Sequence, residues 1–158
     1  MLITLGTITA ALAVLGNGVI YGTDACAGLI MRSVYKRLDD ATVTVSAGWG
    51  HYYGDKRMPI FGAGGAVTAV LTLVIAVLAG QAGAAVGAGI AVVALFVWLG
   101  LYVRVAKPVN NAQKAAAMSG IIPPNARALQ DKWDSIIWVR IGLQGIAIAG
   151  LCAALALF

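Results

Sequence analysis

Long apolar stretches alternate with shorter polar ones along the chain, and four of the apolar stretches predict helices. They cover residues 2–22, about 60–80, about 84–103 and about 136–158, each close to the roughly 20 residues that a helix needs to cross a bilayer. None shows the strict alternation of a barrel strand, and only helices or closed barrels satisfy their backbone groups in lipid. We therefore expect an all-α fold, a single membrane domain over residues 1–158 built as a four-helix bundle.

The polar connection after the first apolar stretch carries an amphipathic pattern. Ile30, Val34 and Leu38 recur every fourth residue between charged positions, which predicts that the first helix continues and lies along the membrane interface. The run ATVTVSAG then breaks the helical period, and we interpret the following GWGHYYGDKRMP as a polar loop. Its last residue, Pro59, is placed to begin the second membrane helix.

The connection before the last apolar stretch predicts the end of one helix and the start of another. Pro108 should end or bend the third long helix, and Ser119 to Asn125 reads as a turn. Asn125 is a good cap, so a helix should restart there and run through Trp133 into the fourth apolar stretch.

Composition and charge support the membrane class and predict an orientation. The chain is 61% hydrophobic and 11% charged, whereas a soluble domain is typically about a quarter charged. Its net charge of +5 does not indicate nucleic-acid binding, because the basic residues flank apolar stretches. The two long connections hold all the Lys and Arg residues except Arg140, which lies just inside the fourth stretch, while the hairpin Gly80 to Gly83 and both termini hold none. A multi-pass protein of the cell membrane follows, with both long connections cytoplasmic and both termini outside.

Several polar residues fall within or beside the predicted membrane helices. Asn17 and Tyr21 lie one turn apart, and Trp133, Arg140 and Gln144 fall within about 40° of one another on one continuous helix. Each has an ordinary explanation, as a bond between helices, an aromatic at the interface or a snorkelling arginine. Polar residues inside a membrane are nevertheless functional candidates by default.

Missing residue types exclude other classes. No Asp or Glu falls inside the predicted membrane stretches, which argues against a proton- or cation-coupled transporter. The chain has one histidine and no CxxC or HxxxH spacing, so we expect neither a bis-histidine haem nor a histidine-rich metal site within one chain. Gly83 and Gly87 have the GxxxG spacing of associating helices, within one chain or in a homo-oligomer.

Two short motifs carry a resemblance to a known family. PVNN at the end of the third apolar stretch and WDSIIWVR at the start of the fourth are similar to motifs of a family of small four-helix membrane proteins that includes the anthrone oxygenases of polyketide pathways. The chain departs from the family at Val139, where the family often has a polar residue. The matching residues are Pro108, Asn110, Asn111, Trp133 and Arg140.

The resemblance implies oxidation of a flat, phenolic, anthrone-like molecule to a quinone by O2, a monooxygenase-type oxidoreductase reaction without a cofactor. A base would remove a proton, and fixed donors would stabilise the electron-rich anion that reacts with O2. His51 is the one side chain whose ordinary pKa suits a base near neutrality, and Arg140 and Asn110, together with Trp133, are the candidate anion-stabilising donors, with His51, Arg140 and Asn110 as the expected catalytic residues. The predicted substrate-binding residues are Asn17, Tyr21, Trp49, Tyr52, Asn111, Trp133 and Gln144.

Two other functions fit the same sequence. The chain could be a non-catalytic, oligomeric membrane subunit or a lipid-binding protein, with a cationic face for anionic lipids. Asn110, Trp133 and Arg140 would then only hold helix ends together. A third hypothesis is a metal-dependent oxidase that builds its site across a symmetric oligomer, with one His51 from each copy. The direction in which the His51 side chain points, between the helices or away from them, distinguishes a catalytic site from a purely structural role.

Overall fold

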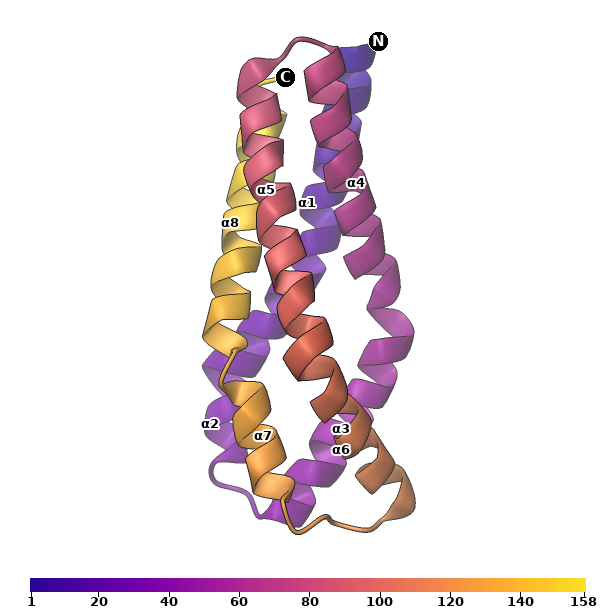
Figure 1. The fold of residues 1–158 in the computed structure, drawn as a ribbon, viewed down its shortest axis with the longest axis vertical. Helices are drawn as coiled ribbons and strands as arrows, with labels where there is room; N and C mark the ends of the chain where they lie inside the picture. Colours follow the sequence, from indigo (N-terminus) through magenta and orange to yellow (C-terminus); the bar gives the residue numbers. More distant parts are fainter. The chain divides into compact units, whose positions relative to one another are not determined.

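The computed structural model describes residues 1–158 and is helical throughout, with no strand. Its α-helices are joined in places by short π-helical turns, labelled η, and the elements follow one another as drawn in Figure 1. In order they are α1 (Leu2–Cys26), η1 (Ala27–Met31), α2 (Arg32–Tyr35), α3 (Asp40–Arg57), α4 (Pro59–Leu78), α5 (Ala82–Leu101), η2 (Tyr102–Ala106), α6 (Lys107–Ser119), α7 (Ala126–Asp134) and α8 (Ile137–Ala156).

Four helical runs are long and apolar enough to cross a membrane, which confirms the four predicted apolar helices. Three of them extend well beyond the predicted stretches, because the helix continues into the polar connections. The runs are Leu2–Tyr35, Pro59–Leu78, Ala82–Ser119 and Ala126–Ala156.

The predicted loop before Pro59 is wrong, because the whole segment forms helix α3. Asp39 caps its start: the side chain accepts a hydrogen bond of 2.9 Å from the backbone N–H of Thr42, and the bonds from Thr42 lower the pKa of this carboxyl. Val43 and Thr44 are β-branched, but both are buried, with 2% and 1% exposure. Burial of one face therefore outweighs the weak helix propensity of this run.

The proline and turn signals are mostly confirmed. Pro59 begins α4, and the turn after α6 starts at Gly120, whose φ of 71° is the left-handed conformation that glycine adopts easily. α7 restarts directly after Asn125, although a turn then separates it from α8. Pro108 does not end the third run. It lies at the start of α6, directly after the π-helical turn η2, an irregularity that suits the missing proline N–H.

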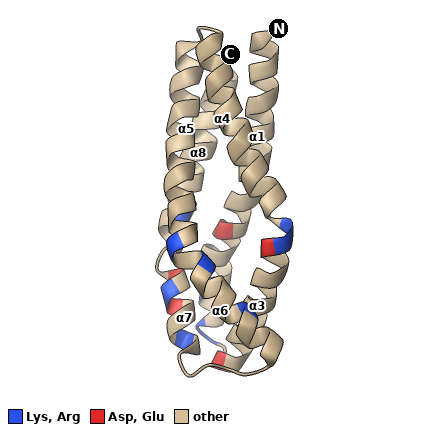
Figure 2. Cartoon of the chain, turned by 45° about the vertical axis from the view of Figure 1, so that its right-hand side comes forward, with Lys and Arg blue, Asp and Glu red and all other residues tan.

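The chain forms two compact units. The apolar unit comprises Met1–Gly22, Pro59–Trp98 and Gly142–Phe158, and the polar unit comprises Thr23–Met58 and Leu99–Ile141. All eleven Lys and Arg residues and all six Asp residues belong to the polar unit. Figure 2 colours the basic residues blue and the acidic residues red. The two units are therefore held together internally by different forces.

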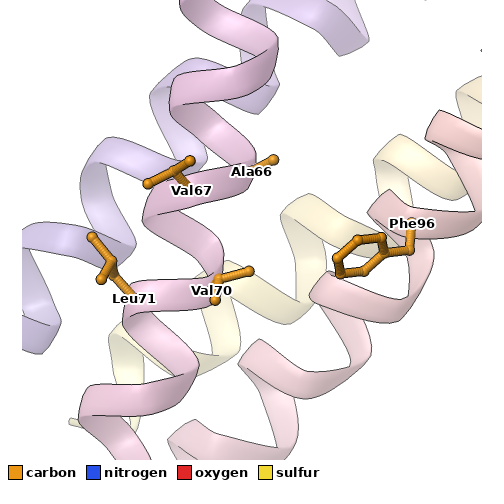
Figure 3. A pocket seen from close by; sticks show the side chains of 5 residues that line it. All are labelled: Ala66, Val67, Val70, Leu71 and Phe96. Atoms are coloured by element: carbon orange, nitrogen blue, oxygen red, sulfur yellow. The ribbon is translucent and has the colours of Figure 1, made fainter.

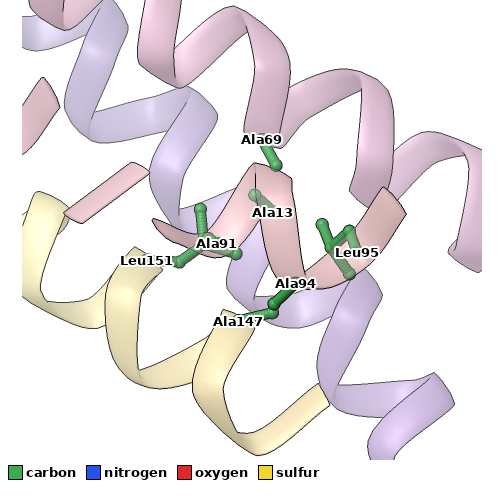
Figure 4. Close-up of a cluster of buried hydrophobic side chains, with 7 residues drawn as sticks. All are labelled: Ala13, Ala69, Ala91, Ala94, Leu95, Ala147 and Leu151. Carbon is green, nitrogen blue, oxygen red and sulfur yellow. The ribbon is translucent and has the colours of Figure 1, made fainter. Parts of the chain in front are cut away.

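Small side chains make the core of the apolar unit. A Cβ on Gly87 would lie 2.7 Å from the carbonyl oxygen of Gly150, and one on Gly16 would lie 3.0 Å from Cα of Gly65. The predicted role of Gly87 in helix packing is thus realised within the chain, where α5 and α8 approach backbone to backbone. The largest buried cluster, drawn in Figure 4, consists of Ala13, Ala69, Ala91, Ala94, Leu95, Ala147 and Leu151.

Candidate functional site

The candidate site begins with a close approach of α3 and α6 in the polar unit. Gly48 on α3 faces the backbone of α6, and a Cβ there would overlap the carbonyl oxygen of Gln113 and the side chain of Ala117. Because the two helices touch at this glycine, His51 lies close enough on α3 to reach Gln113 on α6.

His51 begins a chain of polar side chains that crosses the polar unit. Its Nε2 lies 3.0 Å from Oε1 of Gln113, Nε2 of Gln113 donates to Oε1 of Gln130 at 3.0 Å, and Nε2 of Gln130 donates to Oδ1 of Asp134 at 2.9 Å. Burial lowers the pKa of His51 to about 4, although the bond to Gln113 and the charge of Asp55 oppose the shift. The imidazole is therefore neutral at physiological pH.

Trp133 connects His51 to a buried ion pair. The two ring centroids are 5.8 Å apart, and the indole N–H of Trp133 donates to Oδ1 of Asn110 at 3.1 Å. The guanidinium of Arg140 lies 5.4 Å from the centroid of the same indole ring and binds both carboxylate oxygens of Asp24, at 2.8 and 3.2 Å. The structure thus gathers the three predicted catalytic residues around one tryptophan.

A second carboxylate lies one turn beyond His51 on α3. Asp55 forms an ion pair with Lys114 of α6 and accepts a hydrogen bond of 3.3 Å from the hydroxyl of Tyr102. This pairing adds another tie between α3 and α6. It also places one negative and one positive charge near the imidazole.

The other predicted residues of the polar unit lie toward solvent or lipid. Trp49 is 40% exposed and packs edge-on against Tyr52, with ring centroids 5.3 Å apart, and the hydroxyl of Tyr52 accepts a bond from Lys56. Asn111 is exposed, whereas its neighbour Asn110 is buried. None of these three exposed or edge positions contacts His51 through a hydrogen bond.

The remaining three predicted residues belong to the apolar unit. Asn17 is 1% exposed, and its amide donates to the backbone oxygen of Ala13 at 2.8 Å, one turn earlier within α1. Gln144 is also 1% exposed, and its Oε1 makes no hydrogen bond. Tyr21 is 37% exposed on α1.

Sequence reasoning missed the partners that hold the site. Asp24 lies seven residues after Asn17 and three after Tyr21, so one helix face carries all three, but it was placed just beyond the predicted membrane stretch. Gln113 lies one turn after Asn110, again on one face. Gln130 and Asp134 likewise stand one turn apart. A search for polar residues at helical spacing across the predicted boundaries would have found these pairs.

Two further observations bear on what the chain could bind. No group of three or more His, Cys, Asp or Glu side chains within the chain is arranged to hold a metal ion. A shallow depression on α4 and α5 of the apolar unit has an entirely apolar lining (Figure 3). The lining residues are Ala66, Val67, Val70, Leu71 and Phe96.

Comparison of the chain with models of protein families, with curated proteins and with solved structures gave no match.

Proposed function

We propose that the chain is a multi-pass protein of the cell membrane, with both long connections in the cytoplasm and both termini outside. Large apolar side chains are exposed along the four long helices, as at Leu15 (68%), Leu78 (69%) and Val93 (65%), which suits lipid rather than water. The confinement of every charge to one unit supports the orientation. A reporter fused to the C terminus should behave as external, and a cytoplasmic reporter would overturn the orientation.

We further propose that the polar unit oxidises a flat phenolic molecule of the anthrone type with O2. The observation that carries this proposal is a neutral, partly buried imidazole beside an indole ring, with a buried arginine cation on the same indole. A neutral imidazole can accept a proton, an indole offers a stacking surface, and a cation favours the anion that proton removal creates.

The reaction balances without any other reagent. The imidazole of His51 takes one proton from the methylene carbon of the substrate, and the electron pair left on that carbon forms a bond to O2. The peroxide anion receives the proton back, which gives a hydroperoxide. Loss of the second C–H proton with cleavage of the O–O bond then yields the carbonyl group and water. One O2 is consumed for each quinone, and its four electrons come from the two broken C–H bonds.

The low pKa of His51 shapes this mechanism. With a pKa of about 4 the base form is fully populated at neutral pH, but proton transfer to it is weakly driven. A substrate anion beside the ring would raise that pKa, because an opposite charge favours the imidazolium. The base therefore strengthens when the anion forms, and the Arg140–Asp24 pair supplies a fixed dipole nearby.

Replacement of His51 tests the proposal. Purified protein in lipid nanodiscs should accelerate quinone formation from an anthrone above the uncatalysed rate, and His51→Ala should lose on the order of 100-fold or more of that acceleration. Tyr53→Phe, a change of an exposed aromatic on the same helix that is not among the predicted substrate-binding residues, is the matched control and should keep the wild-type rate. Full activity in His51→Ala, with unchanged thermal stability, would remove the imidazole from the mechanism.

A non-catalytic role is the second candidate, and a specific observation favours it. Asn110, Trp133 and Arg140 all bind partners within the chain, as expected if they only hold helices together. In that case the wild-type protein would not accelerate anthrone oxidation at all. It would instead retain anionic lipids in preference to zwitterionic ones when it is extracted from a bilayer that contains both.

A further inference from the structure

The hydrogen bonds that link His51, Gln113, Gln130 and Asp134 form one continuous series, in which the donor and acceptor roles of each member depend on those of the next. The series runs from α3 through α6 to α7 within the polar unit, and each bond in it is 2.9 or 3.0 Å long. Gln113 and Gln130, the two amides in its middle, are 1% and 4% exposed. Buried amides must satisfy both their donor and acceptor ends, so neither can turn freely.

The carboxylate at the far end sets the orientation of every member. Asp134 accepts a hydrogen bond of 2.9 Å from Nε2 of Gln130, and its other carboxylate oxygen forms an ion pair with Arg32, whose Nε lies 3.7 Å away, so the carboxylate acts as an acceptor. Gln130 must therefore turn its NH2 group toward Asp134 and its oxygen toward Gln113. Gln113 must then turn its NH2 group toward Gln130 and its oxygen toward His51. That oxygen needs a donor, and the only one within reach is an N–H at Nε2 of the imidazole.

We propose that Gln113, Gln130 and Asp134 are positioning residues that hold His51 in the tautomer with its proton on Nε2, which leaves Nδ1 as the atom that accepts the substrate proton. The role of Nδ1 as a base rests on the proposed function, but the tautomer does not. A neutral imidazole has one donor and one acceptor nitrogen, and the partner of one nitrogen decides the state of the other.

Because His51 is the only histidine, the tautomer can be read directly. The protein is made with ¹⁵N-labelled histidine, purified without a polyhistidine tag and placed in nanodiscs at pH 7. The two ring nitrogens then give one pair of resonances. A locked tautomer gives one protonated-type and one lone-pair-type signal, far apart, with the protonated one at Nε2. Exchange between tautomers moves the two signals toward each other.

Variants of the residues that are hydrogen-bonded in series with His51 separate a positioning role from simple packing. Gln130→Leu frees the amide of Gln113 to turn, so the two nitrogen signals should move toward each other. Gln130→Glu still offers an oxygen to Gln113 and should keep the wild-type separation. Asp134→Asn should also bring the signals together, because an amide can face Gln130 either way. Asp55→Asn is the matched control for charge. It removes a carboxylate near His51 that takes no part in the hydrogen bonds from His51 to Asp134, and it should leave the tautomer unchanged.

The outcomes distinguish this inference from the proposed function. Signals that stay apart in the wild type and converge in Gln130→Leu support the positioning role, even if no anthrone is oxidised. Averaged signals in the wild type, a proton on Nδ1, or identical spectra for wild type, Gln130→Leu and Asp134→Asn overturn it, even if the enzyme is active. If both hold, Gln130→Leu should also lower kcat more than it raises KM.

Discussion

The apolar and polar units of this chain reach the same helical architecture by different means, although each contains a close contact at a glycine. In the apolar unit, helices touch through Gly and Ala, and the backbones of α5 and α8 come close at Gly87 and Gly150. In the polar unit, helices are joined by ion pairs, such as Asp24 with Arg140, and by hydrogen bonds between side-chain amides, such as Gln113 with Gln130. Helices in lipid have no hydrophobic drive to associate, so close packing of small residues is what such helices are expected to show, and the apolar unit has this packing.

The contrast predicts different weaknesses. The apolar unit should tolerate no added volume at its glycine contacts, whereas it has no charge to leave unpaired. Away from the contact at Gly48, the polar unit should tolerate modest changes of volume, but removal of one partner from a buried pair leaves the charge of the other partner buried and unpaired. Substitutions in each unit should therefore fail for different reasons.

The largest effect is expected at the contact of α5 with α8. Gly150→Val places a side chain where even a Cβ would lie 2.6 Å from the carbonyl oxygen of Gly87, so the helices must separate. We expect no folded protein after detergent extraction, seen as loss of the monodisperse peak that the wild type gives in size-exclusion chromatography. Gly64→Ala, on an open face of α4, is the control and should elute as the wild type does. A normal peak for Gly150→Val would show that the apolar unit does not depend on this contact.

The next largest effect is expected at the buried pair of the polar unit. Arg140→Met leaves the Asp24 carboxylate buried without its cation, and loss of one partner of such a pair typically costs about 3–5 kcal/mol of stability. Thermal unfolding in detergent should show the loss. The double variant Asp24→Leu with Arg140→Met should recover much of it, since neither charge is then stranded. Equal destabilisation in single and double variants would mean that packing, and not charge, holds this part of the unit.

A smaller, pH-dependent effect is expected at His51. The unfolded chain protonates this imidazole below about pH 6.5, but the folded one only near pH 4, so the unfolded state binds more protons in between. The free energy of unfolding should fall by about 3 kcal/mol as pH drops through this window. Above pH 6.5 both states are neutral and the effect vanishes. The variant His51→Asn should lack this part of the acid loss, and parallel pH profiles of the two proteins would contradict the assigned burial of the imidazole.

The two units also differ in how far the sequence foretold them. The apolar helices follow from long runs of apolar residues, so all four were predicted, and Pro59 marked the start of α4 correctly. Helix α3 was missed because Val43 and Thr44 belong to a run with poor helix propensity, and only their burial against other helices makes it helical. Local pattern carries little information about such tertiary burial.

The residues of the candidate site divide in the same way. His51, Trp133 and Arg140 stood out by their chemistry and do come together. Asp24 and Gln113 did not stand out, because their importance comes from partners distant in sequence. Asn17, Tyr21 and Gln144 looked similar in sequence but belong to the apolar unit, which spacing along one helix could not reveal.

One paired measurement tests most directly whether the chemistry belongs to the polar unit. Initial rates of quinone formation from an anthrone are compared in nanodiscs for Trp133→Phe, beside His51, and Phe96→Leu, in the apolar depression of α4 and α5. Trp133→Phe keeps a ring but loses the donor to Asn110, and we predict a drop of roughly ten-fold in kcat/KM, or more than 1 kcal/mol of transition-state stabilisation. Phe96→Leu should match the wild type. The reverse pattern, with Phe96→Leu slow and Trp133→Phe unaffected, would place the substrate in the apolar unit and contradict the account.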